Sequence, residues 1–380
     1  MIVKDKQGTS VRRGRRRAHR ASAFSLVELL TVVFIISLLI GILIPSINAA
    51  RTAAKKVATK KTIDAIKVGL ELFKNDNGKD FRQTNGYPPS FAHPRIPGYE
   101  FNPHLGEFPF IPEDSDTAPD APLVYGAHWL PAMLMGVDKL GYVKRSNVPN
   151  TEDNLRAKPW RWYLPDPLGK GAEGRPLERM DLYLNPDDVS LLRTDRLAGR
   201  PPALDDSSSN FFHNWEEMKQ LPVIADNFDQ PILYYVASTH GNAQNMVSDA
   251  RSENGEYDSG VQEQGIPYYF HQDNEGFTGT EGVEGWDFGS PQEHTIAKSG
   301  AALGPAAIVG DAGKDTFARY VIDRSIYLSL AHDIGEGHLS DANVPLRPVN
   351  ADSFLLISAG PDGRFGTSDD VSNLPRWPDS

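Results

Sequence analysis

Three aspartates near the C-terminus have the residue type and spacing to bind a metal ion. Asp362, Asp369 and Asp370 lie in a glycine-rich stretch within residues 353–371, directly after an apolar run. Ca²⁺ takes about six to eight oxygen ligands, which carboxylates, backbone carbonyls and water can supply. Glycines allow such a loop to curl, so that Asp362 can approach the two later aspartates. An ordinary solvated turn has the same composition, and composition alone leaves both interpretations open.

A single carboxylate, that of Glu28, lies inside a long apolar run. Residues 24–44 are 21 consecutive positions that are almost all apolar, and Glu28 is the charged one among them. A helix of this length spans about 30 Å, the thickness of the hydrocarbon core of a bilayer. A carboxylate in such a helix is expensive in lipid and therefore indicates a functional role.

A buried core helix and a cleaved secretory signal are the alternatives to a membrane anchor. A core helix needs only about 10–14 apolar residues and has no reason for basic flanks. A secretory signal has about 7–15 apolar residues followed by a small-residue cleavage site. In this chain the small residues, 21–23, precede the apolar run. The sequence therefore predicts a membrane-spanning helix that stays on the mature protein.

Charge is distributed unevenly along the chain, whose formal net charge is −11. Residues 1–23 hold eight Lys or Arg against one Asp, and residues 51–74 hold seven against two acidic residues, so the rest is strongly acidic. A basic segment directly before a spanning helix keeps the N-terminus in the cytoplasm. This placement explains the arginines without a nucleic-acid partner. The chain has no cysteine, which excludes a disulfide framework.

The predicted fold class is α+β, a long N-terminal helix packed on a small antiparallel β-sheet head with large irregular insertions. Residues 1–23 form a basic leader, 24–44 the transmembrane helix, 45–77 the soluble half of the same helix, and 78–380 the head. The soluble half is amphipathic, with apolar residues at three- and four-residue spacing. These residues are Val57, Ile63, Ile66, Leu70 and Phe73.

Two insertions of about 89–220 and 238–350 interrupt the regular part of the head. Two short strands around a polar turn are predicted within 222–236, and a buried strand at 354–358 leads into the acidic loop, 357–371. Short helices are predicted within the insertions near residues 132–140, 187–197 and 316–332.

The residues at the start of the apolar run resemble a known export signal. The segment 23–30, AFSLVELL, is similar to the class III signal of type IV pilins and type II secretion pseudopilins. The resemblance implies that prepilin peptidase cuts between Ala23 and Phe24 and methylates the new amine. It also implies assembly roles for Glu28 and for Pro45, a helix-kinking proline. The family usually has glycine where this chain has Ala23.

The acidic loop carries a second resemblance. Residues 358–370 read S-x-G-x-D-G-x-x-G-T-x-D-D, which is similar to the calcium loop of major pseudopilins, and the hairpin within 222–236 also resembles one in that family. The resemblance implies Ca²⁺ as the bound ion. Its ligands would be Asp362, Asp369 and Asp370, completed by nearby carbonyls.

These resemblances imply a pseudopilin, a structural subunit of the periplasmic fibre of a type II secretion system. The chain would be a single-pass inner-membrane protein with a cytoplasmic N-terminus and a periplasmic head. Its partners would be prepilin peptidase, other pseudopilin subunits and the inner-membrane assembly platform. Glu28 would pair with the amine of Phe24 as the apolar helices leave the lipid. A minor pseudopilin or a type IV pilin subunit is the alternative within this class.

A membrane-tethered carbohydrate-binding protein or hydrolase is the alternative from another class. Trp160, Trp162, Tyr163 and Asp166 have the residue types that line a sugar groove, but they could equally form core and rim. The sequence contains no serine-hydrolase, zinc-protease or P-loop motif. We therefore expect a protein that is not an enzyme.

Overall fold

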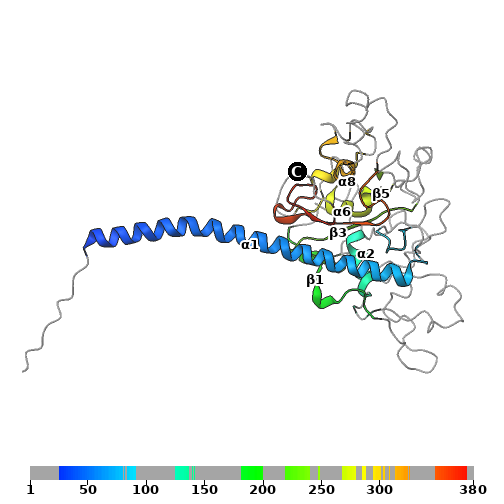
Figure 1. Ribbon diagram of the computed structural model, residues 1–380, viewed down its shortest axis with the longest axis horizontal. Helices are drawn as coiled ribbons and strands as arrows, with labels where there is room; N and C mark the ends of the chain where they lie inside the picture. The colour runs from blue at the N-terminus through cyan, green and yellow to red at the C-terminus, as the bar shows by residue number, and fades with distance from the viewer. Residues whose placement is uncertain are drawn as a thin grey trace, which may run out of the picture. The chain divides into compact units, whose positions relative to one another are not determined.

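The computed structural model divides into two compact units, Met1–Arg51 and Thr52–Ser380 (Figure 1). The predicted leader, the cleavage residues Ala23 and Phe24, and the aromatic residues of the alternative sugar groove lie outside the described part. The residues that the structure describes are 25–79, 81, 84–90, 125–136, 139, 141, 181–199, 219–239, 247–248, 268–279, 285–287, 294–300, 303, 308, 313–323, 325 and 347–374.

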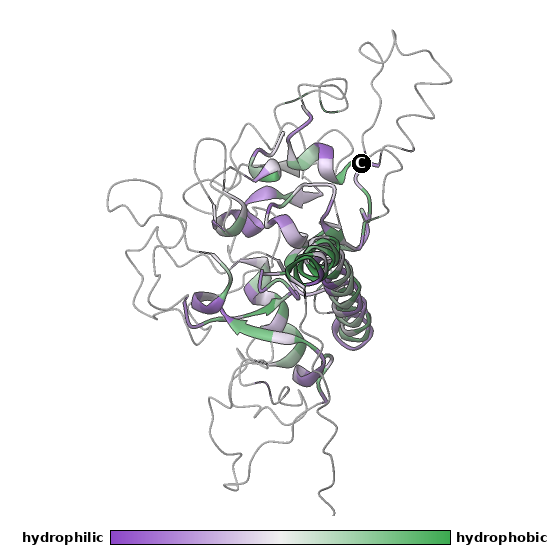
Figure 2. Ribbon diagram, turned by 90° about the vertical axis from the view of Figure 1, so that its left-hand side faces the viewer, coloured by the Kyte–Doolittle hydropathy of each residue, from purple (hydrophilic) through white to green (hydrophobic). Residues whose placement is uncertain are grey.

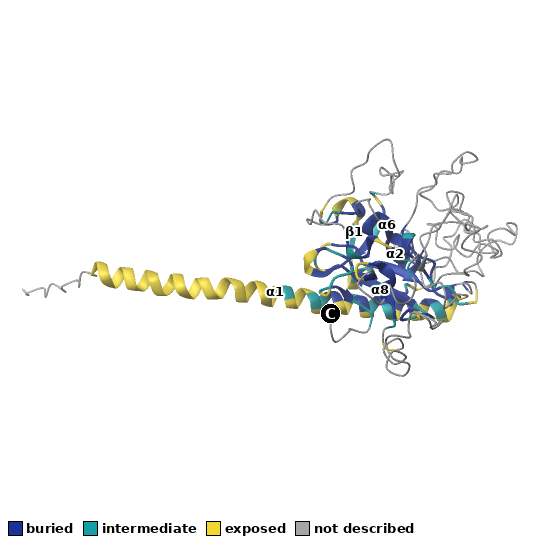
Figure 3. Cartoon of the chain, turned by 90° about the horizontal axis from the view of Figure 1, so that it is seen from above, coloured by how far each residue is buried: buried dark blue, intermediate teal, exposed yellow. Residues whose placement is uncertain are grey.

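The first unit holds the beginning of the long helix α1 (Leu26–Asn77), which continues through Pro45. Its large apolar side chains are exposed from Leu26 to Ile47 (Figure 3). In Figure 2, α1 is seen nearly end-on and carries both hydrophobic and hydrophilic residues. By length and composition, α1 is long and apolar enough to span a membrane. The predicted N-terminal apolar helix is therefore confirmed.

In the second unit, one face of α1 is buried at three- and four-residue spacing. Ile63, Ile66, Leu70 and Phe73 are fully buried, as the periodicity predicts, and they share a core with side chains of the head. Val57, predicted on the same face, is 71% exposed. At about 100° per residue, Val57 lies nearly opposite Ile66, so its inclusion in the buried stripe was wrong.

The described residues form three small sheets, two of them antiparallel. In the first, β3 (Leu233–Val236) pairs with β6 (Phe354–Ser358), which also pairs with β7 (Val371–Ser372). In the second, β1 (Ser190–Arg193) pairs with β2 (Pro222–Ala225). The third is a parallel pair of β4 (Val247–Ser248) and β5 (Tyr269–Phe270). A long helix with small antiparallel sheets is the coarse α+β arrangement that the sequence predicts.

Several predicted elements are confirmed and others are corrected. The buried strand at 354–358 is β6, and an Ala225–Pro231 bridge closes the predicted turn between β2 and β3. The helix predicted at 187–197 is wrong, because the segment contains β1 flanked by short 3₁₀ turns. The helix predicted at 132–140 lies earlier, as α2 (Gly126–Met135), which packs against β2 and β3.

The remaining described elements are short. In Figure 1, α2 lies on one side of β3, and α6 (Glu275–Thr278) and α8 (Phe317–Val321) lie on the other. The short α8 falls within the helix predicted near 316–332, whose later residues are outside the described part. The short elements of the described part are η5 (Pro186–Asp188), η6 (Thr194–Arg196), η7 (His271–Asn274), α6 (Glu275–Thr278), η8 (Thr295–Ala297), α8 (Phe317–Val321) and η11 (Gly360–Asp362).

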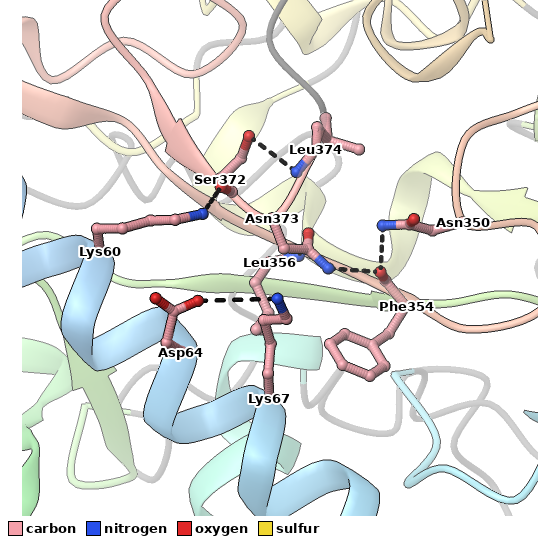
Figure 4. Close-up of polar contacts among 9 residues, drawn as sticks. All are labelled: Lys60, Asp64, Lys67, Asn350, Phe354, Leu356, Ser372, Asn373 and Leu374. Atoms are coloured by element: carbon pink, nitrogen blue, oxygen red, sulfur yellow. Dashed lines mark hydrogen bonds and ion pairs between the residues drawn. The ribbon is translucent and has the colours of Figure 1, made fainter.

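The C-terminal strand β7 is hydrogen-bonded to β6 and to α1 (Figure 4). The Asn373 side chain accepts the Leu356 N–H at 2.8 Å and donates to the Phe354 carbonyl at 2.9 Å, which extends the ladder beyond β7. From α1, the Lys60 ammonium donates to the Ser372 carbonyl at 2.9 Å. The chain between β6 and β7, which carries the predicted acidic loop, is therefore held at both ends.

Candidate functional site

The first turn of α1 places Glu28 in a capping box with Ser25. The Glu28 carboxylate accepts the Ser25 backbone N–H at 2.9 Å, and the Ser25 hydroxyl accepts the Glu28 backbone N–H at 3.1 Å. This reciprocal pair satisfies two N–H groups that the start of a helix leaves without partners. The carboxylate therefore lies at the very beginning of the exposed apolar helix, one turn from the predicted new N-terminus at Phe24.

The acidic loop curls at three glycines with positive φ, Gly360, Gly363 and Gly366. Gly360 and Gly366 have φ angles of +68° and +93°, a region that L side chains rarely adopt. A Cβ on Gly360 would lie 2.4 Å from the Asp369 carbonyl oxygen, so the two ends of the loop are in contact. The backbone N–H of Asp362 lies 3.3 Å from Asp369 Oδ2. The predicted approach of Asp362 to the later aspartates is therefore confirmed at the backbone.

Asp369 and Asp370 come together around one hydroxyl. Thr367 Oγ1 lies 2.6 Å from Asp369 Oδ1 and 3.3 Å from Asp370 Oδ1. Asp362 is exposed, and its carboxylate accepts the Arg364 backbone N–H at 2.8 Å. Partial burial and the neighbouring Asp369 carboxyl raise the pKa of Asp362. Two of the predicted ligands thus share the Thr367 hydroxyl, and the third, Asp362, lies near Asp369 through both its backbone and its carboxyl.

Asp370 is the most perturbed of these carboxylates. It is buried, and its Oδ2 accepts both the Gly366 N–H and the Tyr320 hydroxyl at 2.8 Å. Burial raises the pKa of Asp370 to about 8, although the two hydrogen bonds act in the opposite direction. Among the described residues, neither Asp369 nor Asp370 forms an ion pair with a lysine or arginine.

The donor set of this loop suits a hard cation. Carboxylates, backbone carbonyls and a threonine hydroxyl are the oxygen ligands that Ca²⁺ prefers. Across the described ranges, no three His, Cys, Asp or Glu side chains are grouped closely enough to hold a metal ion. The fit of Ca²⁺ to the loop therefore rests on oxygen chemistry and on the buried carboxyl group of Asp370.

Residues from the second insertion contact the loop, and the sequence interpretation assigned them no role. Besides Tyr320, these are His294, whose Nδ1 accepts the Phe365 N–H at 3.2 Å, and Ile296, whose N–H lies 3.4 Å from the Phe365 carbonyl. No local pattern identifies them, because their partners are 50 or more residues away in sequence. The Ser25-x-x-Glu28 box, however, is readable from sequence as a capping signal. Searches for similar proteins found no matching family model, curated protein or solved structure.

Proposed function

We propose that this chain is a pseudopilin, a structural subunit of the periplasmic fibre of a type II secretion system. The observation that carries the proposal is the construction of α1. Its first half presents apolar side chains on all sides and begins with one capped carboxylate, while its second half is buried on one face in an α+β head. One helix thus combines a membrane anchor with the support of a soluble head.

The proposed topology follows from the two flanks of the apolar segment. The basic leader holds the N-terminus in the cytoplasm, and the acidic head lies in the periplasm. Prepilin peptidase cuts between Ala23 and Phe24, and the assembly platform of the inner membrane then adds the subunit to the fibre. In the fibre, the apolar half of each α1 packs against the apolar halves of neighbouring subunits, which take the place of the lipid.

Glu28 has an electrostatic role in this assembly. Removal of the leader leaves a charged amine at Phe24, next to the capping box. A carboxylate and an amine in apolar surroundings attract strongly, and an unpaired charge there is costly. The pair, within one subunit or between two, favours the register in which both charges are satisfied.

Calcium has a structural role in the proposed head. Asp362, Asp369 and Asp370 would hold the ion together with carbonyls of the loop, and Ca²⁺ supplies the positive charge that the buried Asp370 otherwise lacks. An ion that binds only the folded loop stabilises the head by mass action. Because Lys60 of α1 donates to the Ser372 carbonyl of β7, a more stable loop also holds the second half of α1 more firmly to the head.

Two substitutions separate the charge of Glu28 from its capping role. Glu28→Gln removes the charge but keeps an oxygen that accepts the Ser25 N–H, so the capping box survives. Ser25→Ala removes the capping hydroxyl and keeps the charge. We expect Glu28→Gln to insert and to be processed normally, with a fibre yield reduced roughly 100-fold or more, because breaking a buried ion pair costs about 3–5 kcal/mol. Ser25→Ala should assemble.

The assay is the yield of fibres sheared from cells that express the peptidase and the assembly platform. A wild-type yield of fibres from Glu28→Gln would refute the proposed electrostatic role of Glu28 in assembly. If Ser25→Ala failed as completely as Glu28→Gln, the carboxylate would be a helix cap and nothing more. In both cases, a membrane fraction blotted for the subunit serves as the control for insertion.

A further inference from the structure

Part of the second predicted insertion braces the acidic loop. One contact between the insertion and the loop is made at η8 and the residue before it, where His294 and Ile296 hydrogen-bond both backbone groups of Phe365. His294 Nε2 donates in turn to the Trp286 carbonyl at 2.8 Å, so its Nδ1 is the acceptor for the loop. The Phe365 ring is buried, with its centroid 5.3 Å from that of His294.

A second contact runs through α8. The Tyr320 hydroxyl donates to Asp370 Oδ2 at 2.8 Å, from a position 50 residues away in sequence. The first turn of α8 is bonded to Lys298, the residue that follows η8, because the Phe317 N–H donates to the Lys298 carbonyl at 2.7 Å. The Phe317 ring also packs on Tyr235 of β3, at 4.8 Å between centroids. The two contacts therefore belong to one connected support that is anchored in the core.

The geometry at Asp370 gives the support a specific effect. Oδ2 receives two hydrogen bonds, one from the Gly366 N–H within the loop and one from Tyr320 outside it. Two donors on one oxygen fix the orientation of the carboxylate. The other oxygen, Oδ1, faces the Thr367 hydroxyl that also contacts Asp369. Oδ1 is therefore the oxygen that remains available to a cation shared with Asp369.

We propose that the insertion exists in part to shape the acidic loop, and that Tyr320 is a positioning residue that orients Asp370 toward the bound cation. The inference rests on the proposed calcium site, and it adds to that site a hydrogen bond from outside the loop. Partners that orient a metal ligand typically change metal affinity about 10–100-fold when they are removed.

The test compares two tyrosine hydroxyls in the full-length chain in detergent micelles. Tyr320→Phe removes the bond to Asp370 and leaves the ring. Tyr269→Phe is the matched control, because that hydroxyl bonds the Val349 and Asn350 carbonyls and does not touch the loop. Calorimetric titration with Ca²⁺ should give a Kd weakened about 10–100-fold in Tyr320→Phe and unchanged in Tyr269→Phe. An unchanged Kd in Tyr320→Phe overturns the positioning role.

Hydrogen exchange in chelator tests the brace without calcium. The Gly366 amide, which shares Asp370 Oδ2 with Tyr320, should exchange faster in Tyr320→Phe than in the wild type or in Tyr269→Phe. Wild-type exchange at Gly366 would overturn the brace. If the wild-type chain does not bind Ca²⁺, the calcium part of the proposed function fails, and the exchange rate of Gly366 alone decides whether the insertion shapes the loop.

Discussion

Replacing Asp370 with asparagine should stabilise the chain in chelator, and this gain should become smaller when calcium is present. Asparagine has nearly the same shape and keeps an oxygen that can accept from Gly366 and Tyr320, but it carries no charge. In chelator, the buried carboxyl of the wild type resists ionisation, and its pKa lies at about 8 instead of 3.8. The unfolded chain ionises this group freely at pH 7, which favours unfolding.

The magnitude follows from these two pKa values. Because the folded pKa is raised, the contribution of Asp370 to stability is lost as pH rises from about 4 to about 8. At pH 7, about three units above the ordinary value and at about 1.4 kcal/mol per unit, the loss approaches about 4 kcal/mol. Asp370→Asn should therefore raise the free energy of unfolding in chelator by up to about 4 kcal/mol.

Calcium should narrow the stability difference between the variant and the wild type by about 2 kcal/mol. At about 100 times its Kd, Ca²⁺ stabilises the wild type by about 2.7 kcal/mol, and the variant should gain less than about 1 kcal/mol. The assay is urea unfolding of the full-length chain in micelles, followed by tryptophan fluorescence. Asp352→Asn is the control, since its exposed ion pair with Arg347 is worth at most about 1 kcal/mol. A variant less stable than wild type in chelator would refute the reasoning.

Two further predictions concern His294, which contacts the acidic loop, and Gly69 in the second half of α1. Burial lowers the pKa of His294 to about 4, and the charged groups that face it are Arg364 and Asp287. The neutral His294 side chain therefore stabilises the folded chain fully above pH 6.5, and this contribution is lost as pH falls toward 4. We expect the difference in unfolding free energy between the wild type and His294→Asn to fall by roughly 3 kcal/mol as the pH is lowered from 6.5 to 4. A difference that does not change with pH would contradict this prediction. Gly69→Ala should destabilise the head by about 1–3 kcal/mol, because its Cβ would meet the Tyr183 carbonyl at 2.9 Å. Gly41→Ala, with open space around it, should leave melting unchanged.

The long helix and the core strand could be predicted from sequence because their signals are local. The apolar run and the spacing of Ile63 to Phe73 define α1 through side chains that lie close together along the helix. The continuous apolar run before the acidic loop is enough to define β6. In each case, the apolar residues that identify the element lie within a few residues of one another in the sequence.

The errors arise where distant pairing decides the local structure. The segment Ser190–Arg193 has too few residues to show a strand pattern, and its hydrogen bonds come from β2 after a long intervening segment. Tertiary context of this kind overrides local propensity. For the same reason, glycine spacing predicted the curl of the acidic loop, but nothing near Tyr320 in sequence indicated its bond to Asp370.

If this chain is processed and anchored as a pilin-type subunit, as we propose, the N-terminal residue of the mature protein must show it. The measurement is Edman degradation and intact mass of the protein from membranes of cells with and without prepilin peptidase. We expect an N-methylated Phe24 that appears only when the peptidase is present. An intact leader, or a cut after Pro45, would contradict it and make the apolar helix an ordinary anchor or signal.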